Sequence, residues 1–162
     1  MLVFKPDVVV ALYGPRDRFD IQFDGRIISQ GSSEFAKLFT QHLVKLLEIV
    51  KSANAKLVVL TTPCLGQLTE HYSKMPEIVE NGRRAVVNGL YQSFADAHPK
   101  DVGLVDFGKL VCPMGKFTGS LAGVTYTKDG VHFTPKGAAV VWSFLDPILA
   151  KVIGLYDTAV NN

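Results

Sequence analysis

The sequence of 162 residues has no long apolar run and almost no net charge. Its apolar stretches, such as Val8–Tyr13 and Leu57–Leu60, are far shorter than the roughly 20 residues that cross a bilayer, so we expect no membrane span. The net charge is +2 at pH 7 with scattered basic residues, which argues against nucleic acid as a partner. Residues 1–7 lack the basic start and apolar core of a secretory signal, so they leave the compartment unknown.

The patterns of several common ligand sites are also missing. No set of His, Cys and carboxylate residues has the spacing of metal ligands, and no glycine-rich phosphate loop follows a strand. We therefore expect neither a metal nor a cofactor. Only two cysteines occur, Cys64 and Cys112, and their number alone allows two buried thiols or one bridge.

The apolar content of 48% is enough to fill the core of one domain spanning residues 1–162. Short β-branched runs that predict buried strands alternate with apolar residues at helical spacing. The predicted elements are, in chain order, strand 7–12, a helix over 35–50 with Ser32 or Ser33 as its cap, strand 56–61, helix 77–97, strand 102–106 and helix 135–152. This alternation predicts a three-layer α/β fold of the Rossmann or flavodoxin type, with a parallel sheet and helices on both faces.

Residues 129–137 are the most informative stretch. Asp129 precedes His132 by three residues, so its carboxylate can accept a hydrogen bond from one imidazole nitrogen while the other nitrogen faces a nucleophile. Thr134 as N-cap and Pro135 as first helical residue hold this loop at a helix start. The simpler alternative is that Asp129 only caps the turn before the helix.

The run Asp-Gly-Val-His-Phe-Thr-Pro at 129–135 resembles the last motif of the SGNH (GDSL-like) hydrolases. Residues 5–10 followed by 14–17, Lys-Pro-Asp-Val-Val-Val and Gly-Pro-Arg-Asp, resemble the third block of that family. The closest resemblance is to SGNH domains associated with membrane O-acyltransferases. In those domains the segments Thr-Thr-Pro-Cys, Arg-x-x-x-Asn-x-Leu and Cys-Pro recur in the order found here at 61–64, 84–90 and 112–113.

This resemblance implies an ester hydrolase or O-acyl-transfer domain that acts on acyl esters, carbohydrate esters among them. Asp129 and His132 would be two members of a catalytic triad. Gly14, Arg16 and Asp17 would lie on the oxyanion and substrate-binding side of the site. The family has an Asn donor where Arg16 stands, and a guanidinium is also a donor that can stabilise an oxyanion.

The resemblance also bears on the two cysteines and on the compartment. The related domains face an oxidising, extracytoplasmic compartment such as the periplasm, which favours a disulfide between Cys64 and Cys112. Two separate buried thiols remain an equal alternative. A cytoplasmic location also stays open.

The nucleophilic serine of the family lies in a Gly-Asp-Ser motif after the first strand, and this motif is missing from the sequence. We therefore expect the chain to correspond to the C-terminal part of an SGNH domain, with N-terminal strands missing. An upstream segment or a partner chain would then cover the edge of strand 7–12. Ser32, Ser33 and Ser120 could replace the nucleophile, although capping and turn roles explain them. The alternative function is a catalytically inactive domain that binds carbohydrate or serves as an interaction module.

Overall fold

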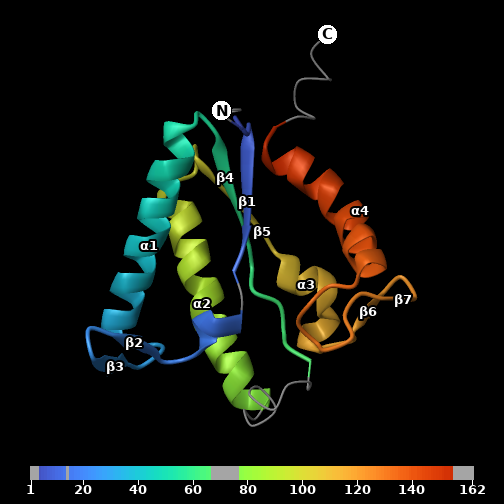
Figure 1. Cartoon of the computed structure of the whole chain (residues 1–162), viewed down its shortest axis with the longest axis horizontal. Coiled ribbons are helices and arrows are strands. Elements are labelled where there is room, and N and C mark those ends of the chain that lie inside the picture. Colours follow the sequence, from blue (N-terminus) through green and yellow to red (C-terminus); the bar gives the residue numbers. More distant parts are fainter. Residues whose placement is uncertain (1–3, 14, 67–76, 155–162) are drawn as a thin grey trace.

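The computed structural model describes residues 4–13, 15–66 and 77–154, which are built around a parallel sheet (Figure 1). The sheet consists of β1 (Val8–Leu12), β4 (Lys56–Leu60) and β5 (Val102–Val105), in the order β1-β4-β5. Both strand pairs are parallel and β4 lies in the middle. The carboxyl ends of all three strands therefore point to the same edge of the sheet.

Helices cover both faces of this sheet. Figure 1 shows α1 (Ser33–Ser52) and α2 (Glu77–Ala97) on one side and α3 (Phe107–Val111) and α4 (Pro135–Val152) on the other. The predicted three-layer α/β fold is therefore confirmed.

The side chains of β4 alternate between two hydrophobic cores because successive residues of a strand point to opposite faces. Leu57 and Val59 pack with residues of α1 and α2, whereas Val58 and Leu60 pack with residues of α3 and α4. The middle strand is thus buried on both faces, as its unbroken apolar sequence predicts.

The predicted bounds of the main elements agree with the observed ones to within two residues, and those of α2 and α4 agree at both ends. Helix α2 continues through Gly82 and Gly89. Both glycines are exposed, so the missing side chains leave no gap in the core. Smaller elements occupy the stretches between the predicted ones. They are η1 (Pro15–Arg18), β2 (Ile21–Phe23), β3 (Arg26–Ile28), η2 (Pro113–Gly115), β6 (Ser120–Leu121) and β7 (Val124–Thr125).

Across the described ranges, no helix combines the length and the apolar character that crossing a membrane requires.

Candidate catalytic site

A pocket of about 390 Å³ lies at the carboxyl end of the sheet, where parallel α/β proteins usually place their functional residues. Most of its wall is apolar. The apolar side chains include Leu12, Leu65, Val111, Phe117, Val131 and Phe133. The polar residues of the wall are Tyr13, Arg18, Tyr126 and His132.

Asp129 and His132 interact directly beside this pocket. Nδ1 of His132 lies 2.5 Å from Oδ2 of Asp129. The other carboxylate oxygen, Oδ1, accepts hydrogen bonds from the backbone N–H of His132 at 2.7 Å and of Val131 at 3.0 Å. Asp129 therefore does both things that its sequence position suggests: one oxygen shapes the turn and the other holds the imidazole.

These hydrogen bonds keep Asp129 ionised. The His132 side chain, followed by the backbone N–H groups of His132 and Val131, holds the pKa of the Asp129 carboxyl well below its ordinary value of 3.8. The His132 side chain is 82% exposed at the pocket rim. Among the residues described, none hydrogen-bonds to its Nε2 atom, so this nitrogen is available to a substrate or a nucleophile.

The turn that carries His132 is fixed to the start of α4. Oγ1 of Thr134 accepts a hydrogen bond from the Gly137 N–H at 2.9 Å, and Pro135 is the first helical residue, which confirms the predicted helix start. The N–H of Thr134 also donates to the carbonyl of Tyr126 at 2.8 Å. Gly137 packs so closely against Tyr126 that a Cβ at position 137 would lie 2.2 Å from the Tyr126 Cα. The start of α4 therefore packs directly against Tyr126, the residue that follows β7.

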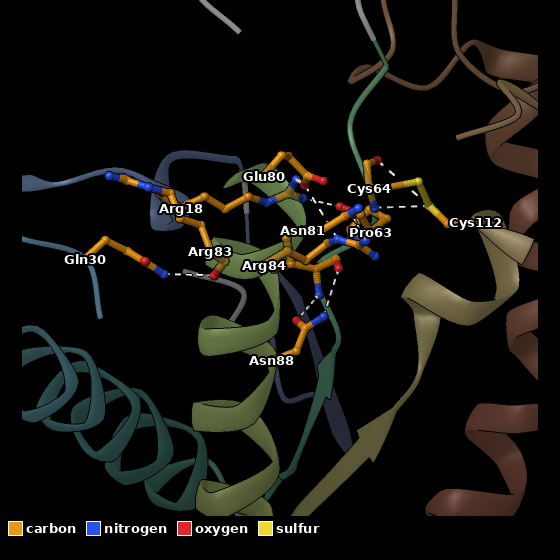
Figure 2. Close-up of polar contacts among 11 residues, drawn as sticks. Arg18, Gln30, Pro63, Cys64, Glu80, Asn81, Arg83, Arg84, Asn88 and Cys112 are labelled. Atoms are coloured by element: carbon orange, nitrogen blue, oxygen red, sulfur yellow. Dashed lines mark hydrogen bonds and ion pairs between the residues drawn. A yellow bond between two sulfur atoms is a disulfide. The ribbon is translucent and has the colours of Figure 1, made fainter. Parts of the chain in front are cut away.

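The β4 loop, residues 61–66, forms part of the pocket wall and is held by side chains from three elements (Figure 2). The Asn88 amide accepts from the Thr62 N–H at 2.8 Å and donates to the Thr62 carbonyl at 3.1 Å. A disulfide joins Cys64 to Cys112, with Cα atoms 6.1 Å apart. Arg18 donates to the Pro63 carbonyl.

Arg18 is the residue of η1 that reaches the pocket. Its side chain is 1% exposed and pairs with Glu80 of α2 (Figure 2). Burial lowers the pKa of Arg18 to about 10, against the opposing effect of the Glu80 charge, so the guanidinium stays charged at neutral pH. Nothing in the sequence indicated that Arg18 would be buried beside the pocket, because a charged residue in a loop is usually solvated.

The other residues predicted for this side of the site lie elsewhere or outside the described ranges. Gly14 is outside the described residues. Arg16 is exposed, and Asp17 accepts a hydrogen bond from the Tyr91 hydroxyl at 3.3 Å. Burial raises the pKa of the Asp17 carboxyl, which the Tyr91 bond partly offsets. Neither Arg16 nor Asp17 lines the pocket, and the oxyanion role stays a prediction for all three.

None of the serines in the described ranges lines the pocket. Oγ of Ser32 caps α1 by accepting from the Phe35 N–H at 3.1 Å, and Ser33 begins the same helix. Ser120 is exposed in β6. The same described ranges contain no group of three His, Cys, Asp or Glu residues arranged to hold a metal ion.

A family model described as "Protein of unknown function (DUF459)" matches residues 3–147. Similar solved structures include a protein provisionally described as a platelet activating factor from Streptococcus pneumonia, with a TM-score of 0.61 and 19% identity over 88% of this chain. A protein described provisionally as an acylhydrolase from Bacteroides fragilis has a TM-score of 0.58 and 20% identity over 91%. A GDSL-like lipase from Bacteroides thetaiotaomicron has a TM-score of 0.57 and 16% identity over 90%.

The matched part of this chain corresponds to 59%, 63% and 63% of the lengths of those three proteins. The identities are low, so these likenesses establish a shared fold. No curated protein matches the sequence.

Proposed function

Because the chain belongs to the family described as protein of unknown function DUF459, which consists of SGNH (GDSL-like) hydrolases, we propose that it supplies the Asp–His part of an acyl-ester site. The single observation that carries this proposal is the 2.5 Å contact between Nδ1 of His132 and Oδ2 of Asp129. It orients the imidazole and leaves Nε2 for proton transfer. His132 would take the proton of a serine hydroxyl and return it to the departing alcohol, while Asp129 stabilises the imidazolium.

The pocket beside His132 suits an acyl group. Its volume of about 390 Å³ lies in the range of small-molecule sites, and its wall is mainly apolar. We propose acyl esters as substrates, with a carbohydrate hydroxyl as one candidate alcohol. The negative charge of the tetrahedral intermediate needs a donor. Gly14, Arg16 and Asp17 are proposed for that side, and Arg18 is a second candidate because it lines the pocket.

The open edge of β1 is where we propose that the nucleophile arrives. Among the described residues, β1 pairs with β4 alone, so its outer edge presents unpaired backbone groups. Leu12 and Tyr13, at the end of this strand, line the pocket. A further strand that runs parallel to β1 would therefore end beside His132. We propose that an upstream segment or a partner chain adds this strand and carries the serine on the turn that follows it.

Two measurements test the proposal. The chain as it stands should hydrolyse p-nitrophenyl acetate at near-background rate and resist labelling by a fluorophosphonate, because serine hydrolases without their nucleophile retain only residual catalysis. Stoichiometric labelling of a serine in this chain would contradict the need for an added nucleophile.

The second measurement supplies the nucleophile. An apolar strand ending in Gly-Asp-Ser is joined through a linker of at least about a dozen residues, the length that a parallel connection requires. Turnover and labelling of the added serine should then appear. Asp129→Asn should lower this turnover by about 10⁴-fold. His132→Gln, which removes the general base, should also lower this turnover strongly. His42→Gln, at an exposed position of α1, is its matched control and should leave turnover unchanged.

One observation favours a second candidate function, a domain that binds acyl groups or carbohydrate without chemistry. No serine among the described residues lines the pocket, and the only two cysteines are bonded to each other. This candidate would be supported over the enzyme if the variant with the added strand showed no turnover while its pocket still bound hexanoate or a sugar.

A further inference from the structure

The β4 loop and the turn that carries His132 meet through two glycines. The N–H of Gly66 donates to the carbonyl of Gly130 at 3.1 Å. The backbones are so close that a Cβ at position 66 would lie 2.6 Å from the Gly130 Cα and 2.7 Å from Cζ of Phe117. Gly130 lies between Asp129 and His132 in the sequence, so the end of the β4 loop presses directly against the Asp–His turn.

The disulfide attaches the β4 loop to the core two residues before Gly66. Asn88 and Arg18 hold the β4 loop at Thr62 and Pro63, and the bond to Cys112 holds it at Cys64. Both cysteines are buried, with exposed fractions of 6% and 2%. Cys112 ends helix α3, which packs into the core below the pocket. The disulfide is thus the last restraint from the core before the contact between Gly66 and Gly130.

We propose that the Cys64–Cys112 disulfide, acting through Gly66, positions the Asp129–His132 turn, and that reduction by a dithiol releases it. Cys64 lines the pocket, so the bond borders the cavity that a small thiol can enter. Any effect of this disulfide on catalysis rests on the proposed function. The mechanical coupling between the disulfide and the turn does not depend on it.

The exchange is an ordinary thiol–disulfide reaction. A thiolate of the dithiol attacks Sγ of Cys64, and Sγ of Cys112 departs as a thiolate. The second thiol of the reagent then closes a cyclic disulfide and releases Cys64. Two electrons pass from the dithiol to the protein, and its two protons end on the two cysteine thiols.

Nitrogen NMR of the full chain at pH 8 tests the coupling, and it needs no enzymatic activity. In the oxidised protein, Nδ1 of His132 lies 2.5 Å from Oδ2 of Asp129, so its nitrogen shift should differ from that of an imidazole without this partner. After treatment with dithiothreitol, the shifts should move toward those of His42, an exposed imidazole on α1. The amide signal of Gly130 should move with them, while those of α1 stay in place.

Gly66→Ala tests the same coupling with the disulfide intact. The added methyl must displace Gly130 or Phe117, so the oxidised variant should show the His132 and Gly130 shifts seen on reduction. Gly89→Ala is the matched control, because a Cβ there meets nothing within 4 Å, and it should reproduce the parent spectrum.

Each result decides the proposal. His132 and Gly130 signals that are the same in oxidised and reduced protein would overturn it. If reduction unfolds the whole chain, as circular dichroism would show, Gly66→Ala decides, and a parent-like His132 spectrum in that folded variant would overturn it. A hydrolytic assay that fails in any of these samples bears on the proposed function alone.

Discussion

The two sides of the pocket are built in opposite ways. The β4 loop is fixed by the Asn88 amide, the Arg18 guanidinium, the disulfide and the contact between Gly66 and Gly130. The outer edge of β1 has no strand beside it in the described part of the chain. One side is therefore organised in advance, and the other is open to an additional element.

This difference separates two tasks of a catalytic site. Orienting the imidazole demands tight geometry, because a small misplacement of a reacting group costs rate heavily. In the proposed site, that task would belong to the fixed side, where the turn of Asp129 and His132 contacts the β4 loop. The open side lies where the proposed nucleophile would enter. Substitutions that loosen the fixed side measure how firmly it is built.

Removing the disulfide should have the largest effect on the fixed side. The bond closes a loop with a sequence separation of 48, for which the chain-entropy model gives about 4 kcal/mol of stabilisation. The double variant Cys64→Ala with Cys112→Ala should lose about this free energy of unfolding, measured by urea denaturation. A loss below about 1 kcal/mol would mean that the other restraints hold the loop without the bond.

Asn88→Ala should have the next largest effect. The Asn88 amide bonds to both the N–H and the carbonyl of Thr62, a residue that is 1% exposed. The variant leaves these two buried backbone groups without this partner. We expect a loss of about 2 kcal/mol in the free energy of unfolding. Gln92→Ala, which removes an exposed amide from the same helix, is the control and should change stability by about 0.5 kcal/mol or less. Equal effects of both variants would contradict a special role for Asn88.

Gly89→Ala should act in the opposite direction and more weakly. This position is exposed in the interior of α2 next to Asn88, and the space for a methyl group is free. Alanine should raise the free energy of unfolding by about 0.5–1 kcal/mol, since glycine loses more backbone entropy in a helix. Thermal denaturation measures the gain. A loss of stability would show that α2 needs the freedom of glycine behind the fixed side.

Lowering the pH from 7 to 4 should have the smallest effect, because the Asp129 carboxyl should remain ionised over this range. Its folded-state pKa lies below the ordinary value of 3.8, so the stabilisation from its hydrogen bonds is present above the unfolded-state pKa. This stabilisation is lost only as the pH falls through the lower, folded-state pKa. The carbon shift of the Asp129 carboxyl should therefore remain that of the ionised form down to pH 4. A midpoint at or above 3.8 would contradict the depressed pKa.

The main elements could be predicted from the sequence because each has a local cause. Strand 56–61 is a continuous β-branched and leucine run, and α4 begins at the Thr134 cap with Pro135 after it. The hairpin of β2 and β3 was missed although Asp24-Gly25 is a known hairpin turn, with φ of 48° and 71° in the structure. Its strands of three residues are too short for a periodicity to register.

The same distinction applies to the candidate site. The pairing of Asp129 with His132 could be predicted because the partners are three residues apart in one turn. The burial of Arg18 and the contact between Gly66 and Gly130 could not, since each joins segments more than 40 residues apart. Such contacts depend on how loops meet at the edge of the sheet, which neither composition nor spacing encodes.

The open edge of β1 also has a consequence for handling the protein. Val-Val-Val-Ala-Leu is an uncharged, β-branched segment whose outer backbone groups are unpaired among the described residues. Segments of this kind recruit identical strands and lead to aggregation. Light scattering should therefore show self-association that increases with protein concentration. A short apolar strand peptide that occupies this edge should keep the protein monomeric, and it would serve as a solubilising additive for storage and crystallisation.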